Sequence, residues 1–462
     1  MANKSKIYND PAKTKAALEE MEKKGVKYVQ IEVPDMDGML RGKIVKPSKG
    51  LGDLGNAYCT ILYGLSTQDD VMESEFSSFE NGFPDLFTVP DLNSVIHHTW
   101  RPDFAAVVCD MVDSKDGSLC PMSPRSVLRM AVEKAEAMGY QHRCAIEYEA
   151  YIMKADNDLI RNGKHYDLSM VSRTMNAYSL TRIADIEELM LKFHERLASV
   201  GISIDSFHCE LGYGQVEFAL SHAPTMEMAD RAARSKLYFK QLCAEHGLVA
   251  TFMSKWRIGD TGTGAHIHHS LWKGGNPAFS TGKAGELSDV GKQFAAGMID
   301  LMPEVTAIYN PVINSYRRRS SRQWCPENAS WAEDNRTAAL RAITRPKPEG
   351  VRIETRQPGG DANPYLSIAA GLLTGLHGIE NKLVPLSYAT GNAGDDKRFR
   401  RLPRNLRDAT EAFKKSQKVH ELFGSEFVGQ YAMTRETECD LWDKWLEDNV
   451  TEWELKRYFD TI

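Results

Sequence analysis

Two glutamates one residue apart, Glu147 and Glu149, lie in a segment whose alternate positions are apolar. With the two-residue period of a β-strand, residues 143–153 place both glutamates on one face. The other face then carries an apolar set: Cys144, Ile146, Tyr148, Ala150 and Ile152. Two carboxylates on one face repel each other unless a cation lies between them. For this pair alone, a strand face exposed to water is an equally good interpretation.

Three further segments divide in the same way into an ionisable and an apolar face. Their ionisable residues are Glu210 and Glu217 around a glycine-containing bend, His266, His268 and Ser270 within residues 262–270, and Arg352, Glu354 and Arg356 within residues 351–356. Faces exposed to water are usually rich in Lys and Glu, whereas these faces combine His and Glu with Arg. The four segments together therefore favour a binding site over a solvated sheet.

This set of side chains is typical of sites for hard divalent cations. Mg²⁺ and Mn²⁺ prefer carboxylate oxygens with an occasional imidazole, and two such ions close together can clamp the phosphates of a nucleotide. Phosphoryl transfer also needs positive charge around the migrating group. The arginines that could supply it are Arg317, Arg318, Arg319, Arg336, Arg341, Arg352 and Arg356, although each one alone could form a surface salt bridge. A two-metal hydrolase is a rival interpretation, but it would not need the arginines.

The composition excludes several other functions. A chain of 462 residues that is 42% hydrophobic can bury a large core, and its net charge of −6 is modest. No basic stripe interleaved with aromatic residues is present, so nucleic acid is not an expected partner. No apolar run approaches the length of a membrane span, and the polar first residues do not resemble a signal peptide. Eight cysteines without C-x-x-C spacing indicate a reduced, cytoplasmic protein and argue against structural zinc.

The elements that must position the ionisable residues fall into two parts, divided near residue 120. In the first part, Asp10 as N-cap and Pro11 at the first helical position predict a helix that ends at Gly25. Strand-like runs follow at residues 28–33, 42–47 and 105–111. We therefore predict a small α+β domain over residues 1–118.

In the second part, predicted helices alternate with the ionisable strands. Ser123 and Pro124 open a helix that ends at Gly139. Further helices are predicted at about residues 184–200, 225–246, 289–302, 365–382 and 406–417. This alternation predicts a large α+β domain with a curved sheet over residues 119–462.

The order and spacing of the motifs resemble those of the glutamine synthetase family. The resemblance rests on Glu147-x-Glu149, Glu210 through Gly-Gln to Glu217, Gly-x-Gly-x-His266-x-His268, Asn314-Ser-Tyr-x-Arg318, Asn335-Arg336, Arg341, Glu354-x-Arg356 and Asp361-Ala-Asn-Pro-Tyr365. It covers nearly the whole chain, including residues 35–43, which look like the start of that family's β-grasp domain. The resemblance implies an N-terminal β-grasp domain and a catalytic domain on a curved antiparallel sheet. It also implies a homo-oligomer of stacked rings, expected to be a dodecamer, with active sites between neighbouring subunits.

The resemblance further implies a role for each matching residue. One metal ion would be held by Glu149, Glu210 and Glu217, and a second, next to the phosphates of ATP, by Glu147, His266 and Glu354. Arg318 would bind the α-carboxylate of glutamate, with Arg356 near its side chain and Gly262 at the glutamate site. Arg336 and Arg341 would stabilise the transferred phosphate, while His268 and Ser270 would contact the nucleotide. Asp85 resembles the aspartate that a neighbouring subunit inserts to bind ammonium.

One departure from the family pattern bears on the substrate. Glutamine synthetases carry a glutamate on a flap shortly after the Asn-Ser-Tyr-x-Arg motif, where it takes a proton from ammonium. In this chain the corresponding position in residues 319–327 holds Trp324, and Glu327 lies beyond it. An aromatic side chain there offers an apolar wall that suits an alkyl or aryl amine. In this respect the chain resembles the γ-glutamylamide synthetases; the alternative is that Glu327 occupies the flap position. A second departure is Thr261-Gly-Thr-Gly264 in place of the family's Asn-Gly-Ser-Gly.

The function expected from the resemblance is ligation of L-glutamate to a small amine in two steps. The γ-carboxylate attacks the γ-phosphate of ATP, in the presence of two or three Mg²⁺ or Mn²⁺ ions, and gives γ-glutamyl phosphate. The amine, deprotonated near Asp85, then displaces phosphate. A glutamine synthetase that uses ammonia is the first alternative. A catalytically inactive structural or sensor protein is the second, although all six metal-ligand positions are filled.

Overall fold

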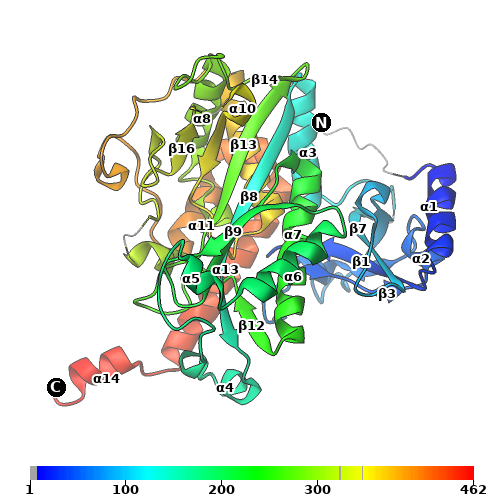
Figure 1. Cartoon of the computed structure of the whole chain (residues 1–462), viewed down its shortest axis with the longest axis horizontal. Helices are drawn as coiled ribbons and strands as arrows, with labels where there is room; N and C mark the ends of the chain where they lie inside the picture. The colour runs from blue at the N-terminus through cyan, green and yellow to red at the C-terminus, as the bar shows by residue number, and fades with distance from the viewer. Residues whose placement is uncertain (1–7, 114, 322–323, 346, 462) are drawn as a thin grey trace.

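The computed structural model describes residues 8–461 except 114, 322–323 and 346, and shows a small N-terminal part beside a larger C-terminal part (Figure 1). The elements of the N-terminal part are α1 (Pro11–Lys23), β1 (Tyr28–Pro34), β2 (Leu40–Arg41), β3 (Ile44–Val45), α2 (Pro47–Gly50), β4 (Ala57–Cys59), β5 (Asp85–Pro90), β6 (Ile96–His97) and β7 (Phe104–Asp113). The strands form one sheet of order β2-β1-β7-β5-β4, with β3 paired to β1 and β6 to β7. Helix α1 starts as predicted, because the side chain of Asp10 accepts a hydrogen bond from the backbone of Ala12.

The strand predicted at residues 42–47 is wrong in detail. Two short strands, β2 and β3, pair with β1 on either side of Gly42, and Pro47 already begins α2. A Cβ atom at residue 42 would lie 1.8 Å from the carbonyl oxygen of Ile31. The backbone approaches β1 so closely at Gly42 that it interrupts the ladder instead of continuing it.

The C-terminal part is built on a ten-stranded sheet. Its strands are β8 (Gln141–Lys154), β9 (Ile204–Cys209), β10 (Gln215–Leu220), β11 (Ala223–Pro224), β12 (Leu248–Thr251), β13 (Ala265–Lys273), β14 (Asn276–Pro277), β15 (Trp331–Glu333), β16 (Leu340–Ile343) and β17 (Arg352–Thr355). The order is β15-β16-β17-β13-β8-β10-β9, with β11 and β12 paired to β8 and β14 to β13. All pairs are antiparallel except β15 with β16. All four segments with an ionisable face contribute to this one sheet.

Helices cover the sheet and form the rest of the C-terminal part. They are α3 (Pro124–Ala137), α4 (Asn157–Arg161), α5 (Leu180–Ile183), α6 (Glu187–Ala198), α7 (Thr225–Glu245), α8 (Asp289–Leu301), α9 (Thr306–Tyr309), α10 (Pro364–Glu380), α11 (Leu406–Lys415), α12 (Gln417–Phe423), α13 (Ser425–Glu447) and α14 (Glu452–Tyr458). Short 3-10 helices are η1 (Thr60–Tyr63), η2 (Leu92–Ser94), η3 (His165–Asp167), η4 (Ile313–Ser321), η5 (Pro348–Gly350) and η6 (Ala393–Asp395). Helix α10 is buried almost all round, as a helix in the centre of a large core must be.

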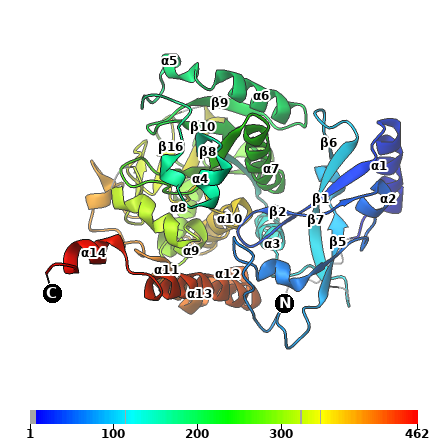
Figure 2. The same ribbon diagram turned by 90° about the horizontal axis from the view of Figure 1, so that it is seen from below.

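The helix predicted at about residues 406–417 is α11, which ends two residues earlier, at Lys415. The backbone of Ser416 is extended, so the chain forms two helices, and the side chain of Ser416 caps the second by accepting a hydrogen bond from the backbone of Val419. The sequence interpretation missed α12 as well as α13 and α14. Helix α14 projects from the body on the side opposite the N-terminal sheet (Figures 1 and 2), and leaves Trp453, Leu455 and nearby Phe459 exposed. Among the described residues, no helix combines the length and apolar content needed to cross a membrane.

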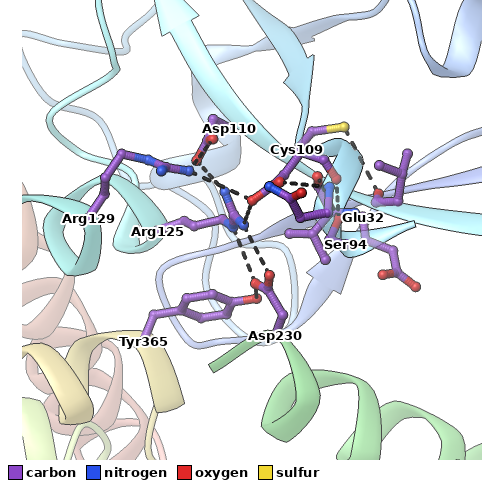
Figure 3. A network of polar contacts seen from close by, with 12 residues as sticks. Glu32, Ser94, Cys109, Asp110, Arg125, Arg129, Asp230 and Tyr365 are labelled. Atoms are coloured by element: carbon purple, nitrogen blue, oxygen red, sulfur yellow. Dashed lines mark hydrogen bonds and ion pairs between the residues drawn. The ribbon is translucent and has the colours of Figure 1, made fainter. Parts of the chain in front are cut away.

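A buried ionic network joins the two parts (Figure 3). Arg125 on α3 donates to Asp110 on β7 and to Asp91 just after β5, each at 2.6 Å, and to Asp230 on α7 at 3.0 and 3.2 Å. Tyr365 donates to Asp230 at 2.7 Å. The planar guanidinium meets three carboxylates at once, which fixes the N-terminal sheet against α3 and α7.

A buried histidine at the start of β8 makes stability depend on pH. His142 lies between the hydroxyl of Thr225 at 2.9 Å and the ring of His269 at 3.1 Å, and burial lowers the pKa of His142 to about 3. As pH falls from about 6.5 towards 3, the unfolded chain takes up a proton that the folded chain does not. The histidine therefore lowers stability by up to about 1.4 kcal/mol for each pH unit in that window. We expect His142→Gln to flatten the pH dependence of urea unfolding between pH 6.5 and 5, at fixed chain concentration. An unchanged slope would contradict this.

Candidate functional site

The register of the large sheet places the ionisable residues of neighbouring strands opposite one another. On one side of β8, Glu149 lies opposite Glu217 on β10, and Glu217 lies opposite His208 on β9. On the other side, Glu147 lies opposite His266 on β13. Two residues further along β13, His268 lies opposite Glu354 on β17, which in turn lies opposite Arg341 on β16. Residues more than 200 positions apart in the sequence thus form one polar floor.

This floor forms the base of a cavity of about 670 Å³. Twelve of the residues predicted for the site line it: Glu147, Glu149, Glu210, Glu217, Gly262, His266, Arg318, Trp324, Arg336, Arg341, Glu354 and Arg356. His268 and Ser270 line an adjoining cavity of about 270 Å³, and Glu147 borders both. Asp85 borders neither, because it is exposed at the start of β5 in the N-terminal sheet. Five further lining residues had no assigned role in the sequence analysis: Ala177, Tyr178, Leu211, Gln215 and Thr261.

One group of potential metal ligands surrounds Glu147. The Nδ1 atom of His266 lies 3.6 Å from Glu147 and 3.7 Å from Glu354, and the Nε2 atom of His268 lies 3.0 Å from Glu147. Single ligand atoms of Glu147, His268 and Glu354 all lie within 4.8 Å of one another. His268, which the sequence assigned to the nucleotide, therefore lies nearer to Glu147 than His266 does and belongs to this group of potential ligands.

A second group surrounds Glu217. His208 lies 3.4 Å from Glu217 through Nε2 and 3.7 Å from Glu210 through Nδ1, and Glu149 lies opposite Glu217 across the ladder. His208 was missed in the sequence, where its only signal was a position two residues before Glu210. Both groups present hard oxygen ligands with imidazole, the ligand types that suit Mg²⁺ and Mn²⁺.

The electrostatics of the two groups differ. Burial and the neighbouring charge of Glu217 raise the pKa of Glu149 to about 8. Burial and Glu217 also raise the pKa of Glu210. Around Glu147, burial alone would raise the pKa, but hydrogen bonds from His266 and His268 outweigh it and hold the pKa of Glu147 well below its usual range. The carboxylates around Glu149 are therefore short of compensating positive charge, which a divalent cation would provide.

The backbone leaves room for a bound group between these side chains. A Cβ atom at Gly264 would lie 2.7 Å from His266 Nε2, 2.9 Å from Glu149 Oε1 and 3.1 Å from the guanidinium of Arg318. The Nε2 atom of His266 is buried without a hydrogen-bond partner. Gly264 thus keeps open a space bounded by two potential metal ligands and one arginine, and the residues present fit a cation with an anionic substrate beside it.

The arginines approach this space from η4, β16 and β17. Arg318 is buried and donates to the carbonyl oxygens of Gln357 at 3.0 Å and Pro358 at 3.1 Å. Arg341 pairs with Asp334 and, at 3.2 Å, with Glu354. Arg356 pairs with Glu354 and donates to the carbonyl oxygen of Arg336 at 3.0 Å. The cavity therefore combines the two clusters of carboxylates with guanidinium groups, as the transfer of a phosphoryl group requires.

Aromatic side chains line the mouth of the cavity. Trp324 and Tyr178 both have backbone φ angles in the left-handed region, +59° and +58°. The ring of Tyr178 packs on that of His208 with centroids 4.5 Å apart. Residues 322 and 323, which precede Trp324 on the expected flap, lie outside the described residues. Glu327 pairs with Arg401 at 2.9 Å and does not line the cavity.

Comparison with known proteins places these features in context. The sequence profile of the glutamine synthetase catalytic domain matches residues 121–458. A glutamate–isopropylamine ligase of Pseudomonas sp. is 35% identical over 451 residues, which cover 96% of this chain and 97% of that protein. A type-1 glutamine synthetase 2 of Dictyostelium discoideum is 33% identical over 445 residues, which cover 94% of this chain and 84% of that protein.

The solved structures agree with the fold expected from the sequence. A structure described as apo GmaS without ligand is similar with a TM-score of 0.81 at 25% identity, and the match covers 96% of this chain and 99% of that chain. The expected α+β class, with helices around a curved and mostly antiparallel sheet, is confirmed.

Proposed function

Because this chain belongs to the glutamine synthetase family, we propose that it joins the γ-carboxylate of L-glutamate to the nitrogen of an organic amine, with ATP as the activating co-substrate. The products would be a γ-glutamylamide, ADP and phosphate. The observation that carries the choice of an amine is the aromatic mouth of the cavity, where Trp324 and Tyr178 offer apolar surface beside the carboxylates. The 35% identity to a glutamate–isopropylamine ligase supports the same choice.

The metal groups have distinct tasks in this proposal. Glu149, Glu210 and Glu217 would hold one divalent cation, and Glu147, His266 and Glu354 a second, with His268 and Ser270 on the nucleotide side. Two or three Mg²⁺ or Mn²⁺ ions would neutralise phosphate charge and help to orient the reactants. Arg318 would bind the α-carboxylate of glutamate, with Gly262 and Arg356 beside it.

The proposed reaction has two steps. An oxygen of the γ-carboxylate attacks the γ-phosphorus, the bond to ADP breaks, and Arg336 and Arg341 stabilise the charge on the transferred group. The amine nitrogen then attacks the acyl carbon, loses a proton near Asp85 of a neighbouring subunit, and phosphate leaves. Activation is needed because a free carboxylate is a very poor electrophile.

A panel of amines tests the proposal. Phosphate release from ATP and glutamate is measured with ammonium, methylamine, isopropylamine, ethanolamine and aniline. We expect kcat/KM for at least one organic amine to exceed that for ammonium by more than about tenfold, a difference of about 1.4 kcal/mol in transition-state binding. Ammonium as the best acceptor would instead identify a glutamine synthetase, the alternative that the Dictyostelium relative favours. No release with any acceptor would favour an inactive family member.

We further propose that the active form is a homo-oligomer of stacked rings, a dodecamer, in the cytoplasm. Two features support an assembly. Asp85 lies well before the cavity residues in the sequence, and it does not border the cavity of its own subunit. Helix α14 projects from the body (Figure 2). Its side chains Trp453 and Leu455 are exposed, as expected for a segment that packs on another chain.

Complementation between inactive chains tests the shared site. Asp85→Ala and Glu149→Ala chains should each be inactive alone. After dissociation and mixing, about a quarter or less of the wild-type activity is expected, because only sites that combine the intact halves of two chains can react. Mixed oligomers without any recovered activity, or a fully active dilute monomer, would refute a contribution from Asp85 across the interface.

A further inference from the structure

A chain of hydrogen bonds connects the metal-binding carboxylates to the loop that carries Gly262. The hydroxyl of Tyr151 lies 2.9 Å from both the carbonyl and the hydroxyl oxygen of Thr261. The hydroxyl of Thr261 donates to the Oε1 atom of Gln215 at 2.5 Å. The Nε2 atom of Gln215 then donates to the carboxylate of Glu149 at 3.0 Å and to the carbonyl oxygen of Gly262 at 2.9 Å.

The orientation of the Gln215 amide is determined by its neighbours. Its Oε1 atom also accepts a hydrogen bond from the backbone of Gly212 at 2.9 Å. Two donors therefore face one end of the amide, and two acceptors face the other, so only one of the two flipped orientations satisfies all four contacts. Gln215 is 2% exposed, and a buried amide with four good partners is held rigidly.

The same residue also positions the other two carboxylates. The backbone carbonyl of Gln215 accepts a hydrogen bond from the backbone of Glu210 at 2.9 Å, and Glu217 follows two residues later on the same face of β10. Gln215 therefore bonds directly to Glu149 and Glu210 and lies two residues before Glu217. The side chain of Gln215 donates a hydrogen bond to Oε2 of Glu149, while Oε1 of Glu149 faces the open space beside Gly264.

We propose that Gln215, oriented by Thr261 and Tyr151, is a positioning residue that aims Glu149 and the Gly262 carbonyl at one point, and so couples binding of a divalent cation to binding of glutamate. The proposal rests on the proposed function, because it assigns Glu149 to a metal and Gly262 to glutamate. The chain departs from its family at Thr261, whose hydroxyl completes the connection. Gly212 leaves room for the Tyr151 hydroxyl, because a Cβ atom at residue 212 would lie 2.1 Å from it.

Titration with Mn²⁺ alone tests this proposal on the full-length, metal-free assembly. We expect Gln215→Met, which keeps the length of the side chain but removes the amide, to weaken one class of Mn²⁺ site by about 10- to 100-fold. The class assigned to Glu147, His266 and Glu354 should keep its affinity. In steady-state assays the same variant should raise KM for glutamate more than it lowers kcat, because the Gly262 carbonyl loses its fixed position.

A pair of substitutions at residue 261 provides an independent readout. Thr261→Val keeps the shape of the side chain and removes the hydroxyl, whereas Thr261→Ser keeps the hydroxyl. We expect Thr261→Val to shift Mn²⁺ affinity in the direction of Gln215→Met, and Thr261→Ser to behave like the wild type. If Gln215→Met does not fold, this pair decides the question alone.

Gln430 offers a matched control for the loss of a buried amide. It is 4% exposed and donates to the carbonyl oxygen of Tyr63 at 2.8 Å, outside both cavities. Gln430→Met should lower the unfolding midpoint without changing either class of Mn²⁺ site. The proposal is overturned if Gln215→Met behaves like Gln430→Met, or if the valine and serine variants bind Mn²⁺ equally well. Because the titration uses neither ATP nor an amine, this result is independent of which acceptor the enzyme prefers.

Discussion

Replacing Glu149 with glutamine is expected to abolish ATP-dependent amide formation and to raise the unfolding midpoint of the metal-free protein. Activity should fall by more than about a thousandfold, or roughly 4 kcal/mol of transition-state stabilisation, because the variant loses the proposed metal ligand at the proposed glutamate site. Stability should rise because Glu149 is a buried carboxyl beside Glu217 and Glu210, and the neutral amide removes their mutual repulsion. The measurements are the rate of phosphate release and thermal unfolding in chelator.

Glu354→Gln serves as the matched comparison. This residue is also a buried potential ligand, but it pairs with both Arg341 and Arg356, so glutamine leaves two guanidinium groups less well compensated. We expect the same loss of activity with a lowered unfolding midpoint. Two inactive variants with opposite shifts in stability would separate a functional loss from a folding defect. Full activity in either variant would refute its assignment to a metal.

The sequence was informative where periodicity and chemistry coincide. The alternation of residues 143–153 predicted β8 closely, because a strand buried on one face must alternate. The short strands β2 and β3 were misread, since two-residue ladders around a glycine leave no periodic signal. The predicted end of the helix at residue 417 lies two residues past the end of α11, because only the extended backbone and the cap at Ser416 mark the boundary.

The residues of the site that were missed share a different property. Tyr178 and Leu211 reach the cavity from loops, where position carries no period. His208 lies on β9, and only the register of β9 with β10 places it opposite Glu217. Gln215 does no chemistry itself, so its type gave no hint of its four buried contacts. Register and loop geometry are properties of the folded chain, and a single sequence does not specify them.

The sharpest test of the acceptor is Trp324→Ala, which should reduce kcat/KM for the preferred amine by more than about tenfold and leave the ammonium reaction within about twofold. Burial of apolar surface stabilises by about 0.8 kcal/mol for each methylene, so three buried carbons are worth roughly 2.4 kcal/mol, or about fiftyfold. Ammonium has no such surface to lose. Alanine is chosen over glycine because both Trp and Ala must adopt the same left-handed φ of +59°, so the substitution changes the side chain and not the backbone freedom.

Two further variants at this position distinguish an apolar wall from simple packing of the flap. Trp324→Phe keeps an aromatic surface and should retain most of the amine preference. Trp324→Glu places a carboxylate at the expected flap position, and should shift the preference towards ammonium. If alanine lowers both reactions equally, Trp324 supports the flap and does not select the acceptor. If all three variants keep the wild-type ratio, the selectivity must come from Tyr178 and Leu211, which also line the cavity, or the chain is an ordinary glutamine synthetase.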